Sequence, residues 1–450
     1  MDGQALVLGL PIDRRQQILS LAVPIMLGMI SQTILNLVDT LMVSSLGAKA
    51  IAAVGFGSFA NFLGIAFVTG MATGVQAISS RRKGEGRASE TAVALNGGLL
   101  LVAAISVPLS ALLIVAAPTF FAALTTDTEV VDIGVPYLQV RLVAMIAVGA
   151  NFAFRGYWNG VNKSKLYLRT LIVMHISNVA ISYVLIFGAL GAPEMGATGA
   201  AIGTAASGFI GTAYYFYLGL AHARVAGFLR GLPDRKTIVS MLRLSVPSGL
   251  QSMFFAAGLT ALFTIVGRIG TFEVAAMNVL ITVTMVAFLP GLGLGLAAAT
   301  LVGQALGRKD IDDAERWAWD VIKVGVAIMM LLGLPMAIAP RLILEAFFGN
   351  EPEALELAIL PLRLAGLTVW SEAILMVLLN SIMGAGATRT ALIVNVGMQW
   401  LLFLPLAYVI GPVLGWGLIG VWSARIGYRV LQSAILMVVW RRRTWANVEV

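Results

Sequence analysis

The sequence predicts an all-α integral membrane protein of about twelve transmembrane helices, arranged as two pseudo-symmetric six-helix bundles. Three observations predict this fold: the apolar composition, the spacing of the apolar runs, and an internal repeat. Of the 450 residues, 59% are hydrophobic and 12% are charged, whereas a soluble domain averages about 25% charged residues. Such a chain could not cover its surface with polar groups in water, so lipid must be part of its solvent.

The composition also excludes several classes of site. Cysteine is absent, which excludes disulfides and thiolate metal centres. The only histidines are His175 and His222, and two isolated histidines do not make a metal site. The net charge of +8 could indicate a nucleic-acid partner, but the basic residues lie in short loops, where they set membrane orientation. We therefore expect no metal centre, no cofactor and no nucleic-acid partner.

Twelve apolar runs approach the length of about 20 residues that a spanning helix needs. The run that begins at Ile18 exceeds the roughly 7–15 residues of a signal-peptide core and has no clear cleavage site, so we take it as a retained span. Gly411, Pro412 and Gly415 predict a tight turn between the last two runs. The predicted spans are residues 18–45, 51–79, 92–117, 130–155, 167–190, 197–221, 240–268, 274–303, 317–340, 354–381, 390–411 and 415–439.

Basic residues gather in alternate loops, and acidic residues gather in the others. The basic loops and the tail carry Arg81, Arg82, Lys83 and Arg87; Lys163, Lys165 and Arg169; Arg224, Arg230, Arg235 and Lys236; Arg308, Lys309 and Arg316; Arg389; and Arg441, Arg442 and Arg443. The opposite loops carry Asp127, Glu129 and Asp132; Glu194; and Glu351, Glu353 and Glu356. Cytoplasmic loops are enriched in Lys and Arg. The alternation therefore predicts a multi-pass protein with both termini in the cytoplasm.

The two halves of the chain resemble each other at an offset of 223 residues. Residues 42–55 read MVSSLGAKAIAAVG, and residues 265–278 read IVGRIGTFEVAAMN. The same offset pairs Pro24 with Pro247. Matches of glycine and proline at a fixed spacing reflect shared backbone geometry, which composition alone does not reproduce easily.

The repeat predicts the domain organisation. We expect an N-lobe over residues 1–221, a basic cytoplasmic linker over 222–238 and a C-lobe over 239–450. Each lobe holds six spans, and an even number returns the chain to its starting side. Both lobes therefore insert with the same orientation, related by an axis along the membrane normal, and a transport path is expected between them.

Five motifs resemble those of the multidrug and toxic compound extrusion (MATE) family, in the family's order and over nearly the whole chain. They are LVDT with the following MV, LG and AAVG within 37–55, NVAISYVLIFG at 178–188, MGATGAAIGT at 195–204, PSGLQ at 247–251, and GAG with TR within 384–389. The resemblance, to prokaryotic NorM-like and DinF-like members, implies a two-lobed, V-shaped exporter. It implies a monomer in the inner membrane of a prokaryote that exchanges protons or sodium ions for organic, often cationic and amphipathic compounds by alternating access.

Two carboxylates stand out within spans, Asp39 in the first and Glu372 in the tenth, because a charge at a helix centre costs about 2.5–3.5 kcal/mol on insertion scales. Asp39 lies in the apolar stretch LNLVDTLMV, where desolvation favours the protonated carboxyl. Such a group can accept a proton on one side and release it when its surroundings rewet. The alternative is that Asp39 is simply hydrated near the end of its helix, or pairs with an arginine.

The resemblance supplies partners for Asp39, since Pro24, Tyr137, Asn178 and Thr204 stand at the family's N-lobe positions. Pro24 leaves a helix carbonyl without its hydrogen bond, which predicts a kink in the first helix. If protonation changed the bend of this helix, Asp39 would be coupled to the cavity. The alternatives are a static kink at Pro24 and an ordinary interhelical hydrogen bond at Asn178.

Ser182 departs from the family pattern, because many prokaryotic members carry a second aspartate there. A single carboxylate weakens a sodium site, since hard cations prefer several oxygen ligands. We therefore prefer the proton as coupling ion, with sodium at Asp39 or Glu372 as the alternative.

Glu372 matches an acidic position that the NorM branch uses for cation binding, and Gln251 is a second candidate in the C-lobe. That branch also has a glutamate after two phenylalanines in the seventh helix, whereas residues 254–256 here read Phe-Phe-Ala. The C-lobe sodium site is therefore in doubt. Glu372 either attracts a cationic substrate or pairs with Arg363.

A flippase for lipid-linked precursors is the alternative function. It would need clustered arginines to hold a pyrophosphate, and Arg141, Arg155 and Arg363 are the candidates within spans. No GxxxxGK, GxSxG or HExxH motif occurs, so we expect neither ATP hydrolysis nor another enzyme activity. A channel is harder to exclude, but the duplicated architecture suits alternating access. Asp39 favours a multidrug efflux antiporter whose partners are organic cations and the lipid bilayer.

Overall fold

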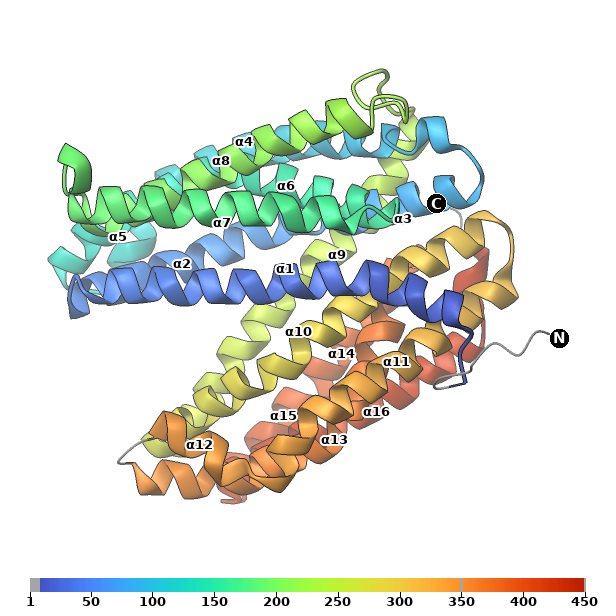
Figure 1. Cartoon of the computed structure of the whole chain (residues 1–450). Helices are drawn as coiled ribbons and strands as arrows, with labels where there is room; N and C mark the ends of the chain where they lie inside the picture. The colour runs from blue at the N-terminus through green and yellow to red at the C-terminus, as the bar shows by residue number, and fades with distance from the viewer. Residues whose placement is uncertain (1–8, 349–350, 449–450) are drawn as a thin grey trace. The chain divides into compact units, whose positions relative to one another are not determined.

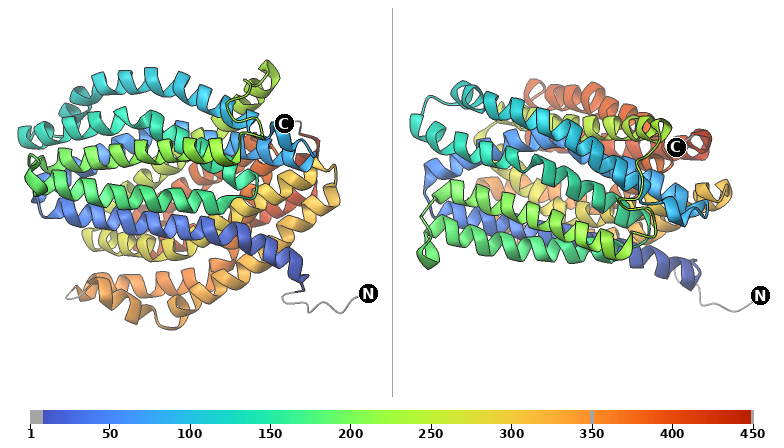
Figure 2. Two further views of the ribbon diagram at one scale, coloured as in Figure 1. Left: turned by 45° about the horizontal axis from the view of Figure 1, so that its top comes forward. Right: turned by 90° about the horizontal axis from the view of Figure 1, so that it is seen from above.

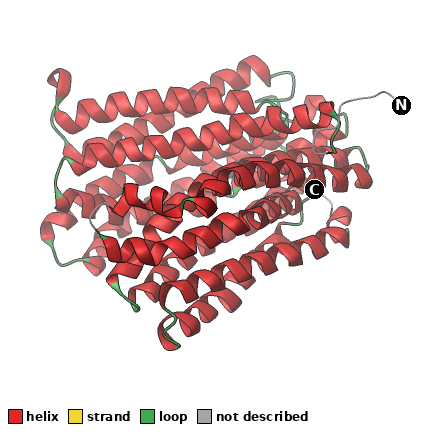
Figure 3. Cartoon of the chain, turned by 60° about the horizontal axis from the view of Figure 1, so that its bottom comes forward, coloured by secondary structure: helices red, strands yellow, loops and turns green. Residues whose placement is uncertain are grey.

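The computed structural model describes residues 9–348 and 351–448, and the two chain ends lie outside these ranges. Helices and the loops that join them make up the described chain in every view (Figures 1, 2 and 3). The colouring by secondary structure shows no strand in this part of the chain (Figure 3). The all-α prediction is therefore confirmed.

Twelve long helical segments in the described residues correspond one by one to the predicted spans. They are α1 (Ile12–Ser44), α2 with α3 (Ala48–Thr69 and Met71–Gly84), α4 (Val93–Leu124), α5 with α6 (Thr128–Val143 and Met145–Gly160), α7 (Ser164–Phe187), α8 (Gly196–His222), α9 (Arg235–Gly267), α10 (Thr271–Gly307), α11 (Ile311–Ile338), α13 (Pro352–Gly384), the stretch from α14 to a π-helical turn (Thr388–Val413) and α16 (Gly417–Arg441). A short helix that was not predicted, α12 (Pro340–Phe348), joins α11 to α13.

Most of these segments are apolar enough to cross a bilayer on their own. In the part of the chain that the structure describes, nine helices meet this condition, and α5 with α6, bent by 44° at their junction, makes a tenth. The remaining two, α8 with 27 residues and α16 with 25, are also long enough. Glycine, threonine and tyrosine residues lower the hydropathy of α8, and Arg425 and Arg429 lower that of α16. The prediction of about twelve helices is confirmed.

Contacts divide the chain into two compact units. We call residues 27–252 the N-unit, and residues 1–26 with 253–450 the C-unit. The boundaries fall inside α1 and α9, soon after Pro24 and Pro247, which occupy equivalent positions of the repeat. The predicted lobes put the start of α1 in the first half and the start of α9 in the second, so the two divisions differ there. The lobes defined by the repeat stay a prediction.

Small residues allow close helix packing within the N-unit. The helices α7 and α8 lie side by side along their lengths (Figures 1 and 2), and α3 packs against α6. A Cβ added at Gly156 of α6 would lie 3.0 Å from the Cα of Ala72 in α3. Small residues at such crossings are typical of membrane helices, because they let backbones approach closely.

The predicted linker is tied to the N-unit by hydrogen bonds. Asn96 of α4 donates its side-chain amide to the carbonyls of Gly227 and Gly231, at 2.9 and 2.7 Å, and accepts from the backbone N–H of Leu229. At the end of the linker, Asp234 accepts from the backbone N–H of Thr237 at 3.1 Å and so caps α9. Hydrogen bonding from Thr237 lowers the pKa of Asp234 below its ordinary value.

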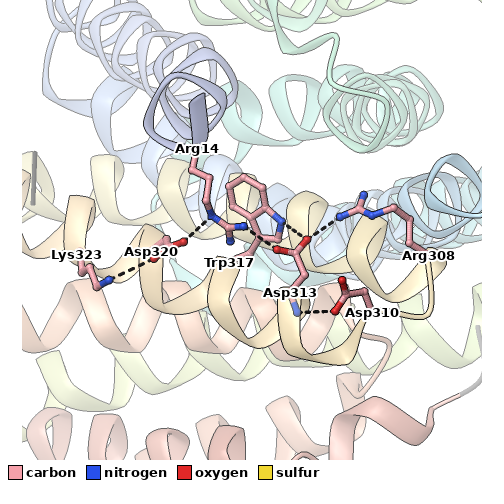
Figure 4. Close-up of polar contacts among 7 residues, drawn as sticks. All are labelled: Arg14, Arg308, Asp310, Asp313, Trp317, Asp320 and Lys323. Carbon is pink, nitrogen blue, oxygen red and sulfur yellow. Dashed lines mark hydrogen bonds and ion pairs between the residues drawn. The ribbon is translucent and has the colours of Figure 1, made fainter. Parts of the chain in front are cut away.

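In the C-unit, the start of α1 is anchored to α11 by one arginine (Figure 4). Arg14 donates to the carboxylates of Asp313 and Asp320, both at 2.7 Å. Its guanidinium carbon also lies 3.7 Å from the ring centroid of Trp317, an attractive cation–π geometry. The apolar side of the same segment, with Ile18 and the residues after it, joins the core of the C-unit. Charge pairing and burial thus hold the first turns of α1 in this unit.

We expect Arg14→Ala to lower the stability of the protein by about 1–2 kcal/mol, between the values typical of exposed and buried ion pairs. The loss stays moderate because Asp313 keeps Arg308 and Asp320 keeps Lys323. Thermal unfolding of the purified protein in detergent measures the effect. Arg15→Ala is the matched control, since Arg15 forms no ion pair in the described chain. An equal loss in both variants would contradict the anchoring role.

Candidate functional site

The N-unit holds a cavity of about 510 Å³ between α1, α2, α5 and α8. Its lining residues are Asn36, Asp39, Thr40, Val43, Ile51, Val54, Gly55, Ser58, Asn61, Phe62, Ile65, Tyr137, Arg141, Ala200 and Thr204. Asp39 and Arg141 are the charged members of this described set. Its volume lies within the roughly 300–1,000 Å³ of small-molecule sites. Apolar and polar side chains share the lining about equally, and it carries one charge of each sign.

Asp39 has unmet hydrogen-bonding capacity. Its carboxyl oxygen Oδ1 is buried and has no hydrogen-bond partner in the described chain. The carboxyl also forms no ion pair with Arg141, although both line the cavity. A buried carboxylate oxygen without a partner is costly, so this half-buried group favours binding a proton or a cation. The predicted alternative of a direct arginine pair is not found among the described residues.

The structure brings several predicted residues together with Asp39. Tyr137 and Thr204 line the same cavity, and the hydroxyl of Tyr137 lies 3.0 Å from Ser58 Oγ. Asn178 of α7 does not line the cavity, but its side-chain amide donates a hydrogen bond to Oγ1 of the lining residue Thr204 at 3.2 Å. The interhelical hydrogen bond weighed for Asn178 therefore exists, and it fixes a residue of the cavity wall.

Two predicted residues stand apart from the cavity. Ser182 is fully buried in α7 and does not line it. Pro24 lies inside an uninterrupted α1, in the other compact unit. It is fifteen residues from Asp39, or about 22 Å along the helix. Pro24 can therefore act on Asp39 only through the helix itself, and its coupling role stays a prediction.

Glu372 lines a second cavity, of about 70 Å³, within the C-unit. Its carboxylate oxygen Oε1 lies 3.3 Å from Nε of Arg429. The predicted pairing with Arg363 is wrong, because Arg363 is exposed and Arg429 takes that place. Gln251 belongs to the N-unit and does not line this cavity. A role for Glu372 in binding a cation stays a prediction: its oxygen Oε1 pairs with Arg429, while Oε2 is buried and has no hydrogen-bond partner in the described chain.

Sequence reasoning missed Arg425 and Arg429 of α16. Both lie in the predicted span 415–439 and both line the cavity of Glu372. The signal was available, because two arginines four residues apart inside an apolar run mark one face of a spanning helix as functional. Naming only Arg141, Arg155 and Arg363 as arginines within spans was therefore an error.

A family model decides the identity of the fold. The MatE model matches residues 24–184 and, a second time, residues 247–409. The two matches cover well over half of the chain, and they begin at Pro24 and Pro247, at the offset of the internal repeat. The chain belongs to the MatE family. The family resemblance inferred from the motifs is confirmed.

Bacterial proteins of the NorM type are similar to this MatE chain along most of its length. It is 27% identical to the probable multidrug resistance protein NorM of Pseudomonas aeruginosa over 418 residues, which cover 91% of this chain and 86% of that protein. It is 26% identical to the multidrug resistance protein NorM of Photobacterium profundum, covering 88% and 87% of the two chains. These relatives agree with a polytopic membrane transporter of prokaryotic type.

Solved structures of the family share the fold. One is described as the outward-facing conformation of a multidrug resistance MATE family transporter of the MOP superfamily. It matches this MatE chain with a TM-score of 0.88 at 21% identity, covering 97% of both chains. Another is a MOP superfamily transporter from Pyrococcus furiosus described as having a binding pocket of reverse polarity. It has a TM-score of 0.85 at 22% identity, covering 96% of both chains. At these identities the likeness establishes the fold.

Proposed function

We propose that this MatE protein is a secondary multidrug efflux antiporter that couples proton uptake to the export of organic compounds by alternating access. The relatives named as multidrug resistance proteins support drug export. Proton coupling rests on one observation, the unpartnered carboxyl of Asp39 in a large cavity that also holds Arg141. The alternating basic loops and the bacterial relatives support a prokaryotic inner membrane with both termini in the cytoplasm.

The charges of the cavity favour the proton over sodium. A sodium ion is best held by several oxygen ligands, preferably with more than one negative charge. This cavity offers one carboxylate, and the guanidinium of Arg141 in the same lining opposes a second cation. Ser182, at the position of the family's second aspartate, adds neither a charge nor a lining group. A proton needs only the one carboxyl.

The same charges provide a way to expel a cationic substrate. When Asp39 is ionised, its charge attracts an organic cation, and the apolar side chains around it, such as Ile51, Val54 and Phe62, receive the apolar body. Protonation of Asp39 from outside removes the attraction and leaves the positive charge of Arg141, which repels the cation. One proton thus exchanges for one unit of substrate charge without a metal or another cofactor.

Transport by the purified protein in proteoliposomes tests this function. A fluorescent organic cation should be transported under an imposed proton gradient, while a sodium gradient alone should have no effect. Transport driven by sodium alone would overturn the choice of coupling ion. Failure to move cations, together with scrambling of a lipid-linked sugar, would favour a flippase.

Arg141→Gln should bind the organic cation more tightly but release it more slowly. Removing the repelling charge should lower the Kd about 3- to 10-fold, which corresponds to about 1 kcal/mol of Coulomb energy at a few ångströms in a wet cavity. Equilibrium binding and the turnover number in proteoliposomes measure the two effects. Arg141→Lys keeps the charge and serves as the control. Weaker cation binding by Arg141→Gln would mean that Arg141 does not oppose the substrate.

A further inference from the structure

One face of α7 in the N-unit is exposed from its first turn to its last. Exposed residues recur on this helix at intervals of three or four, so they form one stripe. The stripe begins with two basic residues, continues with aliphatic ones and ends with two aromatic ones. Its members are Lys165, Arg169, Ile172, Ile176, Val179, Tyr183 and Phe187. This order is expected of a helix that faces lipid, with charges at the headgroups and aliphatic side chains along the acyl chains.

Two tyrosines of α8 lie beside the basic end of the stripe. The guanidinium carbon of Arg169 is 5.7 Å from the ring centroid of Tyr214, and the rings of Tyr214 and Tyr217 stack with centroids 6.0 Å apart. Nζ of Lys163 donates to the carbonyl of His222 at 3.2 Å, so the start of α7 lies next to the end of α8 (Figures 1 and 2). We call this surface the α7–α8 patch and define it as Lys165, Arg169, Tyr214 and Tyr217.

The positive charges of the α7–α8 patch are not compensated within the described chain. Lys165 and Arg169 form no ion pair there. Neither α7 nor α8 contains an acidic residue, and the adjoining loops add Lys163 and Arg224 at the same end. Cations that gather without counter-charges attract an anion from the surroundings.

The depth of the α7–α8 patch matches the headgroup layer of a bilayer. Arg169 lies five residues after the start of α7, and Tyr217 five residues before the end of α8, or about 8 Å from each helix end. The polar layer on each side of the hydrocarbon is about 5–8 Å thick, and tyrosines are enriched at its inner boundary. The next turns of the stripe present Ile172 and Ile176, which suit an acyl chain and have no use for a soluble anion.

We propose that the α7–α8 patch binds the headgroup of an anionic phospholipid, with one acyl chain along Ile172 and Ile176. The planar guanidinium of Arg169, placed by the ring of Tyr214, can hold a phosphate through two parallel hydrogen bonds. Lys165, one turn away, adds a second charge. The inference goes beyond the efflux function and does not depend on it. Only the assignment to the inner leaflet rests on the orientation proposed above.

Two lipids with identical acyl chains test the proposal. Dioleoyl phosphatidylglycerol carries a net negative charge, and dioleoyl phosphatidylcholine is neutral overall. Native mass spectrometry of the purified full-length protein, titrated with each lipid in detergent, gives the Kd of the first bound lipid. Phosphatidylglycerol should bind about tenfold more tightly, because basic residues at a membrane surface attract anionic lipids. Equal binding of the two lipids would overturn the proposal.

A soluble competitor distinguishes a lipid site from a phosphate site. Glycerol 3-phosphate in large excess should leave phosphatidylglycerol bound, because it offers no acyl chain to the aliphatic part of the stripe. If it displaced the lipid, the patch would be a site for a soluble phosphate and the proposal would be wrong.

Removing the two charges should remove the preference for the anionic lipid. We expect the double variant Lys165→Gln with Arg169→Gln to bind both lipids equally. The matched control is Lys309→Gln with Arg389→Gln in the C-unit, which removes one exposed lysine and one exposed arginine that form no ion pair in the described chain. The control should keep the tenfold preference. An equal loss in both double variants would contradict a specific site. Unfolding temperatures verify that each variant is folded.

A substitution that keeps both charges tests the geometry of the α7–α8 patch. Tyr214→Leu removes the ring beside Arg169 and should reduce the preference about threefold. Tyr183→Leu, at the other end of the stripe, should leave it unchanged. The reverse pattern would place the lipid at the other end of α7 and overturn the proposal. These measurements need no ion gradient, so a failure of proton-driven export would not affect them, and equal binding of the two lipids would leave export intact.

Discussion

Replacing Asp39 by asparagine is expected to reduce efflux driven by a proton gradient to the level of protein-free liposomes. Asparagine has nearly the same shape but stays neutral at every pH, so it can neither take up a proton nor attract a cation. Asp39 is the acidic residue of the described cavity lining, so no other carboxyl of that set can replace it. The affinity for an organic cation should also fall, by about tenfold for a loss of about 1.4 kcal/mol.

The control for Asp39→Asn is a change at a neighbouring position of the same cavity. Asn36 lies one turn before Asp39, lines the cavity, and accepts a hydrogen bond from Gln32 at 3.1 Å. Asn36→Ala should keep proton-driven transport, because it removes no titrating group. Asp39→Glu should recover part of the activity. Intact proton-driven efflux in Asp39→Asn would refute the coupling mechanism.

Infrared difference spectroscopy adds a direct measurement of the proton. Acidification protonates many of the 22 Asp and Glu side chains, but the part of the protonated-carboxyl band that belongs to Asp39 should be missing from the difference between the wild-type protein and Asp39→Asn. If the two proteins gave identical bands over the whole accessible pH range, Asp39 would not be the group that carries the proton.

The membrane spans could be predicted from the sequence because each is a local property of the chain. The predicted span 167–190 corresponds to α7, Ser164–Phe187, and 240–268 lies within α9, Arg235–Gly267, to within one residue. Length and apolar character determine such segments before any tertiary contact forms. The repeat was also readable, because proline and glycine constrain the backbone wherever they stand.

The contacts between helices that are distant in sequence could not be predicted in the same way. Nothing local in the sequence indicates that the start of α1 packs in the C-unit, because that placement depends on Arg14 reaching Asp313 and Asp320, about 300 residues away. Likewise, Glu372 and Arg429 are distant in sequence and become partners only when α13 packs against α16.

The sequence motifs correctly predicted those site residues that the fold places around one cavity. Asp39, Tyr137 and Thr204 do converge on one cavity, because they lie on helices α1, α5 and α8, which wall the cavity. Pro24 shares a helix with Asp39 but not a cavity, since fifteen residues of helix separate them. The residue types in the sequence therefore indicated a site that binds a proton or a cation. The packing of the helices determined which of these residues line the same cavity.

Gly203→Ala is expected to destabilise the protein by at least about 3 kcal/mol, at the upper end of overpacking effects. Gly203 of α8 faces α7, and a Cβ added there would lie 2.8 Å from both the Cα and the backbone nitrogen of Ser182. Real Cβ atoms do not approach a backbone so closely, so α8 would have to move away from α7. Thermal unfolding in detergent measures the loss.

Gly208, on the same helix, provides a control with the opposite expectation. A Cβ at Gly208 would lie 3.9 Å from the Cβ of Ala147, an ordinary contact, so Gly208→Ala should be neutral or stabilising by up to about 1 kcal/mol through its higher helix propensity. Similar destabilisation in both variants would mean that glycine serves α8 in general and not the crossing at Ser182.

The crossing of α7 and α8 also bears on transport, because Thr204 follows Gly203 directly and accepts a hydrogen bond from Asn178 across the same interface. Separating α7 from α8 would therefore displace a wall of the Asp39 cavity, and any Gly203→Ala protein that still folds should lose proton-driven efflux.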